Sequence, residues 1–375
     1  MLMRTQELYD WLLEHGGPVI RYRTATELVP PAKSLGAPRM AKELMESPLV
    51  RMWLDRLVPA SFLTEMPEQK IWALIEVHSA APAALENVIP KLTGFGLRRG
   101  MPEFDQRILP YRRWVQKNSE HQPSHIHELS ILGLTTVFLA HAGYVNEPGV
   151  AANLKNRLDI VSDFVWRGDY DIYVMERGNV PKVLRGHPLI RPDLTRGGVV
   201  SLPMIYDIVG WAAYLSGRDA GDDWAKADSV INYILCEEYQ RLPFGYGVMT
   251  DGAGGFWSLG CSIHMPGFTD SLSPERSQAL QVWLVDLLMY FRAARRHPWL
   301  RESLDHLEGF RTERGTSLFP RSYLQERTQG MWINGHRMGL EENRRRSLAL
   351  ELESTFWMAR LRRALSAPSP VDASR

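Results

Sequence analysis

Apolar residues recur at helical spacing along most of the chain and predict a series of paired helices. The second helix of each pair is expected at 125–140, 202–215, 275–291 and 346–365. The first helices are expected at 85–92, 154–165, 226–239 and 300–310, with further helices at 18–29, 48–57 and 71–77. Two second helices have start signals, Ser201-Leu202-Pro203 and Ser273-Pro274-Glu275, in which a capping serine precedes an early proline.

A short motif occurs twice. Gly255-Phe256-Trp257-Ser258-Leu259-Gly260 and Gly330-Met331-Trp332-Ile333-Asn334-Gly335 share the pattern Gly, apolar residue, Trp, two residues, Gly, and begin 75 residues apart. This period fits two helices joined by a long loop, and each motif ends such a loop. Loops of about 30 residues inside a compact domain are commonly functional.

Strand patterns are short and fall in the loops, for example at 170–174, so the sequence predicts an all-α fold. Paired helices either stack into an open solenoid or close into a ring. The long loops favour a closed α/α toroid, in which they gather at one mouth of a central cavity. Residues 1–375 are expected to form this single domain, with helices in 1–60 packing on or completing the ring and 366–375 forming a disordered tail.

Two segments resemble a known superfamily. Ser354-Thr355-Phe356-Trp357-Met358-Ala359-Arg360-Leu361 is similar to an inner helix of the α/α toroid of the prenyltransferase and squalene-terpene cyclase superfamily, and 251–260 resembles the glycine-aromatic turn before it. The resemblance spans about residues 60–365 and implies about five to six helix pairs around an aromatic-lined cavity. The same fold houses glycosidases, polysaccharide lyases and binding proteins, so the resemblance leaves the function open.

Charge and cysteine content narrow the class of protein. With 44 Lys and Arg against 43 Asp and Glu, the net charge of +1 gives no field that would recruit nucleic acid. The two cysteines cannot build a disulfide framework, and no run of about 18 uncharged apolar residues predicts a transmembrane segment. We expect a cytoplasmic protein that binds a small molecule and no nucleic acid, with a homo-oligomer left open.

The inner helices carry polar groups beside aromatic ones. Asp207, Trp211 and Tyr214 fall at i, i+4 and i+7, which places a carboxylate and two aromatic rings on one stripe. A carboxylate among aromatic rings is desolvated, which favours its protonated form and a role as general acid. The alternative is that Asp207, like Asp286 in a similar stripe, pairs with an arginine or a backbone N–H between helices.

Histidines give two further candidate sites. His121, His125, His127 and Glu128 form the densest titratable cluster, either a metal site or a capped helix start, and His127 and Glu128 are candidate catalytic residues. Asp251, Cys261 and His264 have the ligand types of the zinc in protein prenyltransferases, although their spacing does not match that family's motifs. A divalent metal such as zinc is therefore a possible cofactor.

His187, His264 and His336 follow their loops by similar intervals. They are either imidazoles presented to one mouth or unrelated surface residues.

The leading hypothesis is an enzyme that acts on an apolar or isoprenoid-like molecule by acid-base chemistry, as a cyclase, isomerase or lyase. Asp207 is the expected acid, and the residues expected to contact substrate are Trp211, Tyr214, Tyr246, Trp257, Trp332 and His336. One alternative is a carbohydrate-active toroid using Asp207 with Glu353 or Asp251. Others are a metal-dependent prenyltransferase-like enzyme and a non-enzymatic binding protein.

Overall fold

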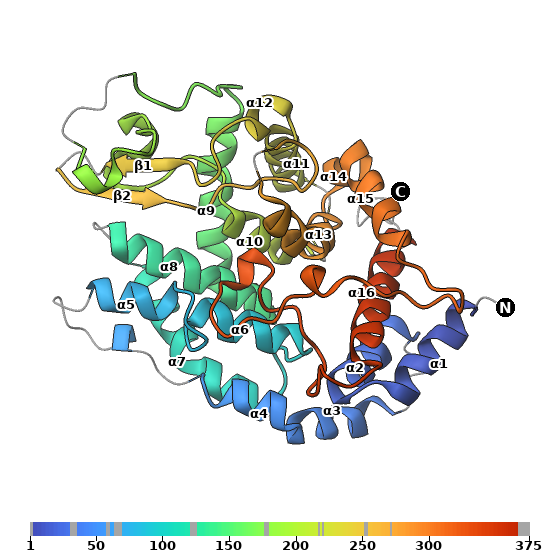
Figure 1. Cartoon of the computed structure of the whole chain (residues 1–375). Coiled ribbons are helices and arrows are strands. Elements are labelled where there is room, and N and C mark those ends of the chain that lie inside the picture. Colours follow the sequence, from blue (N-terminus) through green and yellow to red (C-terminus); the bar gives the residue numbers. More distant parts are fainter. Residues whose placement is uncertain are drawn as a thin grey trace.

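The computed structural model describes residues 3–30, 36–57, 61–63, 70–120, 126–175, 180–216, 218–219, 221–250, 254–270 and 272–366. This part of the chain is mostly helical and contains one small two-stranded sheet (Figure 1). The helical prediction is therefore confirmed.

The helices are distributed along the whole chain. The N-terminal ones are α1 (Thr5–His15), α2 (Pro18–Arg23), α3 (Ala37–Glu46), α4 (Pro48–Leu54), α5 (Lys70–Val77) and α6 (Leu85–Gly94). The central ones are α7 (Pro102–Ser119), α8 (Ile126–Leu139), α9 (Pro148–Val165), α10 (Ile205–Leu215), α11 (Asp222–Ile234) and α12 (Glu237–Gln240). The C-terminal ones are α13 (Pro274–Leu288), α14 (Arg292–Arg296), α15 (Pro298–Glu308) and α16 (Ala349–Ser366).

All four predicted second helices are present, as α8, α10, α13 and α16. Ser273 caps α13 as predicted, because its side chain accepts a hydrogen bond from the Arg276 N–H. The start signal at Ser201 is wrong. Helix α10 begins only at Ile205. The Asp207 carboxylate accepts a hydrogen bond from the Met204 N–H at 2.8 Å and caps the start of the helix.

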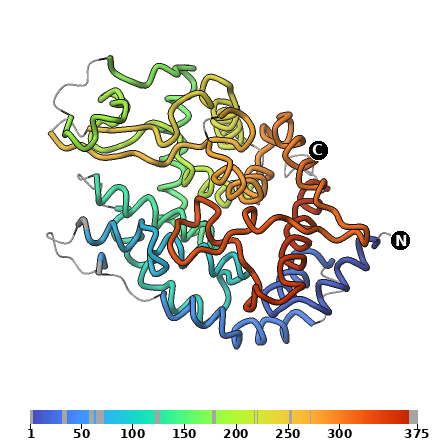
Figure 2. The backbone as a smooth tube through the Cα atoms, viewed as in Figure 1, coloured from blue at the N-terminus to red at the C-terminus, as the bar shows by residue number. Residues whose placement is uncertain are grey.

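The second helices contact one another in chain order, and α6, which was predicted as a first helix, precedes them in the series. Helix α6 packs against α8, α8 against α10, α10 against α13, and α13 against α16. Helix α16, red in Figure 1, also packs against the blue helices α1 and α2, and Figure 2 shows the same proximity of these N-terminal and C-terminal helices. The helices α7, α9 and α11 pack against members of this series or against one another: α7 on α8, α9 on α8 and α10, and α11 on α9 and α10.

Helix α8 lies at the centre of these contacts, since α5, α6, α7, α9 and α10 all touch it. With the turn that follows, Ile126–Tyr144 is long and apolar enough to cross a membrane by length and composition alone. In this fold 56% of the segment is buried inside the protein. Its apolar character is therefore accounted for by packing against five other helices.

The sheet is a hairpin of β1 (Gly247–Thr250) and β2 (Phe256–Leu259), in which Met249 pairs with Trp257. Gly247 has a φ of 134°, and a Cβ atom there would lie 2.3 Å from the Pro188 carbonyl oxygen, so only glycine fits. The hairpin is thereby held against the segment before η7 (Pro192–Gly198), beside α9 in Figure 1.

The two Trp motifs adopt different structures. Trp257 lies in strand β2, whereas Trp332 begins the 3-10 turn η9 (Trp332–Asn334). The Trp332 N–H donates to Asn87 Oδ1 of α6 at 2.8 Å, and its ring lies edge-on to Trp283 of α13 at 5.1 Å. The similarity of the motifs therefore does not extend to their conformation.

Candidate active site

A cavity of about 340 Å³ lies between α5, α8, α9, α10 and the hairpin. Apolar side chains form most of its wall, among them Leu74, Ile126, Leu132, Val137, Ile160, Met204 and Met249. Its polar lining includes His78, Tyr206, Cys261 and the pair Arg157 and Asp207. A largely apolar cavity of this size with a few polar groups is typical of small-molecule sites.

Three residues at this cavity form a hydrogen-bonded triad. His78 follows the end of α5, Glu86 lies in the first turn of α6, and Tyr206 lies in the first turn of α10. Glu86 Oε2 is 2.7 Å from His78 Nδ1 and accepts the Tyr206 hydroxyl at 2.6 Å. The Tyr206 oxygen is also 3.0 Å from His78 Nδ1.

The members of the triad differ in how far their side chains are exposed. The Glu86 side chain is fully buried, and its Oε1 atom has no hydrogen-bond partner among the described residues. His78 is 29% exposed and lines the cavity. Because Nδ1 is bound to Glu86, Nε2 is the ring atom left for a ligand, and no described residue bonds to it.

The electrostatics of the triad favour a charged imidazole. Burial alone would lower the pKa of His78, but the hydrogen bond and the charge of Glu86 outweigh it, so the pKa is raised above 6.5. Burial raises the pKa of Tyr206 well above 10, with Glu86 adding to the effect. Tyr206 is therefore a neutral hydrogen-bond donor at neutral pH, and His78 is the group that exchanges a proton there.

Asp207 lies in the cavity wall as expected, but its contacts are those of the paired alternative. Arg157 of α9 donates to Asp207 Oδ1 and Oδ2, both at 2.8 Å, and donates to the Leu202 carbonyl at 2.7 Å. With the Met204 N–H as a third donor, the carboxylate fastens the start of α10 to α9. Asp286 is also paired, with Arg360 at 2.6 Å.

Two other predicted residues meet at the cavity. His127 of α8 and Trp257 of β2 line it, and their rings lie edge to face with centroids 6.0 Å apart. Glu128, next to His127, is not among the lining residues. The hairpin therefore brings one of the two motif tryptophans to the cavity.

The other predicted contact residues pack elsewhere. Trp211 is fully buried, and its Nε1–H donates a hydrogen bond to the Leu154 carbonyl. The Tyr214 hydroxyl donates to Asp223 at 2.9 Å. The Tyr246 hydroxyl donates to the Pro203 carbonyl at 2.6 Å. None of the three lines the cavity. Trp332 and His336 also lie outside the lining, and burial with nearby arginines lowers the pKa of His336 to about 4.

The predicted metal ligands do not form a site in the described residues. Asp251 lies outside them, as do His121 and His125. His264 has both ring nitrogens within hydrogen-bond distance of protein oxygens, the Ser262 hydroxyl at 3.2 Å and the Leu242 carbonyl at 2.9 Å. Cys261 lines the cavity, and burial raises the pKa of its thiol to about 12. Within the described ranges no three His, Cys, Asp or Glu side chains lie close enough to hold a metal.

The carboxylate pair of the carbohydrate alternative is likewise not assembled at this cavity. Asp207 is the only acidic residue among its described lining residues. Glu353 is fully buried on α16, where it accepts the N–H groups of Leu340 and Glu341 and pairs with Arg344. Its contacts are those of a structural carboxylate.

Sequence reasoning missed all three residues of the triad. Glu86 belongs to the predicted helix at 85–92, where Asn87 and Lys91 are also polar, so the sequence carries no local signal that its carboxylate is buried. Comparison with protein-family models, with curated proteins and with solved structures found no match.

Proposed function

We propose that the protein is an acid-base enzyme acting on a largely apolar small molecule, an isomerase or lyase, with His78 as the group that moves the proton. The observation that carries this proposal is the His78, Glu86 and Tyr206 triad at the wall of an apolar cavity. A histidine with a perturbed pKa in such a cavity is a reasonable candidate for proton transfer.

The geometry supports a specific division of labour. In its neutral form, His78 accepts a proton from a substrate carbon at Nε2, while Nδ1–H stays bonded to Glu86, whose charge stabilises the imidazolium that forms. Tyr206 holds the same Glu86 oxygen and fixes its orientation. Return of the proton to another carbon completes an isomerisation, and departure of a leaving group from the adjacent carbon completes an elimination.

The apolar wall selects the substrate class. Leucine, isoleucine, valine and methionine side chains form most of the lining, and Trp257 and His127 add aromatic surface. Such a wall stabilises hydrocarbon by removing it from water and provides few hydrogen bonds for a sugar. An isoprenoid-like or other predominantly hydrocarbon substrate fits this chemistry.

We also propose that the helix pairs close into an α/α toroid. The series α6, α8, α10, α13 and α16 continues to α2 through contacts of α16, and Arg23 of α2 donates to the Gly94 carbonyl of α6 at 2.7 Å. These contacts form a continuous circuit. In this arrangement, the cavity would lie towards one side of the ring, at the starts of α8 and α10.

Metabolite profiling tests the proposed activity. Purified protein is incubated with a lipid-rich extract of the host cells, and mass spectrometry compares wild type with His78→Gln and with His187→Gln, an exposed histidine. The proposal predicts that wild type and His187→Gln deplete the same apolar compound and form an isomer or an elimination product, whereas His78→Gln does not. Equal profiles for wild type and His78→Gln would refute it.

A further inference from the structure

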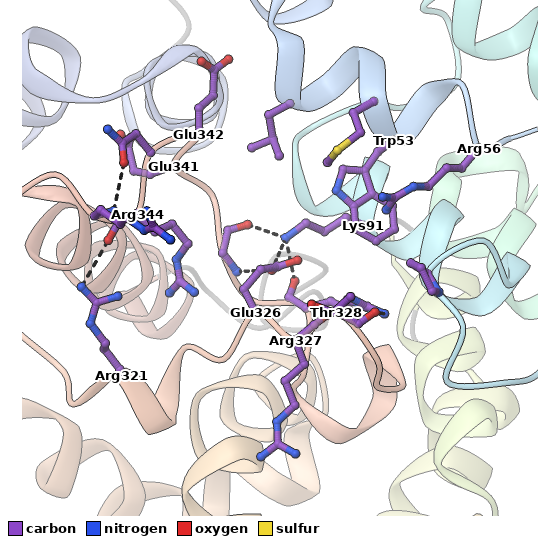
Figure 3. Close-up of a pocket in the computed structure, with 17 residues that line it drawn as sticks. Trp53, Arg56, Lys91, Arg321, Glu326, Arg327, Thr328, Glu341, Glu342 and Arg344 are labelled. Carbon is purple, nitrogen blue, oxygen red and sulfur yellow. Dashed lines mark hydrogen bonds and ion pairs between the residues drawn. The ribbon is translucent and has the colours of Figure 1, made fainter.

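A second cavity, of about 700 Å³, lies between α4, α6 and the segment 321–345 (Figure 3). Its lining is rich in positive charge. The basic residues are Arg56, Lys91, Arg321, Arg327, Arg337, Arg344 and Arg345, and the acidic ones are Glu326, Glu341 and Glu342.

Three of these cations are already neutralised. Lys91 Nζ lies 2.5 Å from Glu326 Oε2 and also donates to the Gly339 carbonyl, as the dashed lines in Figure 3 show. Arg344 pairs with the buried Glu353 at 2.7 Å, and Arg327 pairs with Glu275. These three side chains are held by protein groups.

Arg56 and Arg337 are different. Both guanidinium groups lie over the Trp53 ring, 4.3 and 5.4 Å from its centroid, and neither forms an ion pair with a described carboxylate. Arg337 is only 5% exposed. Its Nη atoms donate hydrogen bonds to carbonyl oxygens, including that of Thr328 at 3.3 Å. Its Nε atom is buried and has no hydrogen-bond partner among the described residues. A buried cation without a counter-ion is costly, because desolvation is not repaid by attraction.

The surrounding carboxylates offset this cost only in part. Burial lowers the pKa of Arg337 and the charge of Arg56 lowers it further, while Glu326 and Glu86 act in the opposite direction without restoring the usual value. Glu326 is the carboxylate that acts on both arginines, and Lys91 already binds it. The seven basic lining residues, against the three acidic ones and the partners Glu275 and Glu353, leave an excess of two positive charges, which a doubly charged anion would balance.

We propose that this cavity binds a small molecule through a phosphate group placed between Arg56 and Arg337. Guanidinium groups bind phosphate oxygens with paired hydrogen bonds. Arg56, which lines the cavity and stacks on Trp53, provides these donors, and Arg337 contributes its charge. The volume exceeds that of a phosphate, and Leu49, Met52 and Pro82 provide an apolar wall for the rest of the ligand. This site is independent of the acid-base chemistry assigned to His78.

Calorimetric titration of the full-length protein with inorganic phosphate at pH 8 tests the proposal, with acetate at equal ionic strength as the singly charged comparison. Arg56→Gln is the test variant. Arg51→Gln is the matched control, because Arg51 lies on α4 shortly before Arg56, pairs with Glu103 and does not line the cavity.

We expect phosphate to bind wild type and Arg51→Gln with similar affinity and Arg56→Gln at least tenfold more weakly, with acetate binding weakest. Circular dichroism verifies that the variants are folded, and Arg337→Gln, which removes the second unpaired charge, is expected to weaken binding as well. Absence of phosphate binding, or equal affinity in wild type and Arg56→Gln, would overturn the proposal.

Discussion

Glu86 and Tyr206 stand 120 residues apart in the sequence and share a hydrogen bond of 2.6 Å in the interior of the protein. This bond ties α6 to α10 and orients the carboxylate that also holds His78. The candidate catalytic group is thus fixed by two helices while its own side chain stays partly exposed to the cavity. Its properties give the first two predictions.

The pKa of His78 should lie above 6.5 in the folded protein. Because folding raises the pKa of His78, protonation of its ring stabilises the folded protein. This contribution is fully present below the unfolded-state pKa of 6.5 and is lost as the pH rises through the folded-state pKa. NMR titration of the histidine ring protons measures the value, with Glu86→Gln expected to lower it. A wild-type value at or below 6.5 would contradict the role given to Glu86.

Removing the Tyr206 hydroxyl should destabilise the protein. Tyr206→Phe takes a donor from the fully buried Glu86 carboxylate, and we expect a loss of about 1 to 3 kcal/mol in the free energy of unfolding. Urea denaturation provides the measurement. Tyr214→Phe is the matched control and should cost less than about 1 kcal/mol, because its partner Asp223 is partly exposed. Equal losses of stability in the two variants would contradict the prediction that the hydrogen bond to the buried Glu86 carboxylate contributes more than the bond to Asp223.

Asp207→Asn should affect stability more than chemistry. The substitution leaves Arg157 without its carboxylate in a largely buried pair, at a cost of about 3 kcal/mol in the free energy of unfolding. The double variant Asp207→Asn, Arg157→Gln should lose less than the sum of the single variants, as denaturation curves can show. Complete loss of turnover in a folded Asp207→Asn protein would restore Asp207 as the acid.

Gly335 should not tolerate a side chain. It has a φ of 71°, and a Cβ atom would lie 1.9 Å from the Ala279 carbonyl oxygen, so Gly335→Ala is expected to cost more than about 2 kcal/mol of stability. Gly94→Ala is the control, because nothing lies within 4 Å of its Cβ position, and it should change stability by less than about 1 kcal/mol. Thermal denaturation compares the two variants, and a tolerated Gly335→Ala would mean that η9 is packed differently.

Most helices could be predicted from the sequence because an apolar stripe with helical spacing is local information. Helix α7 was missed although its buried residues Phe104, Ile108, Tyr111 and Val115 form such a stripe, because Pro110 and many charged residues obscure it. The hairpin was also missed, since its short strands depend on Gly247 fitting against the Pro188 carbonyl, a contact between distant segments.

The candidate site was less predictable than the fold. Asp207 and Trp257 both line the cavity, but the sequence does not show that Arg157, on another helix, neutralises Asp207. His78, Glu86 and Tyr206 come from three elements, and no local pattern links them. Residue types near one another on one helix suggested a site, whereas the actual cluster depends on how the helices pack.

The most direct test of the account is the fate of the proton that His78 is proposed to move. The compound identified by profiling is converted in D₂O by wild type, His78→Gln and His187→Gln, and mass spectrometry follows the product. In an isomerisation, wild type and His187→Gln should place deuterium from the solvent on carbon, and His78→Gln should form no product. If His78→Gln converts the compound at the wild-type rate, His78 is not the acid-base group and the central claim is wrong.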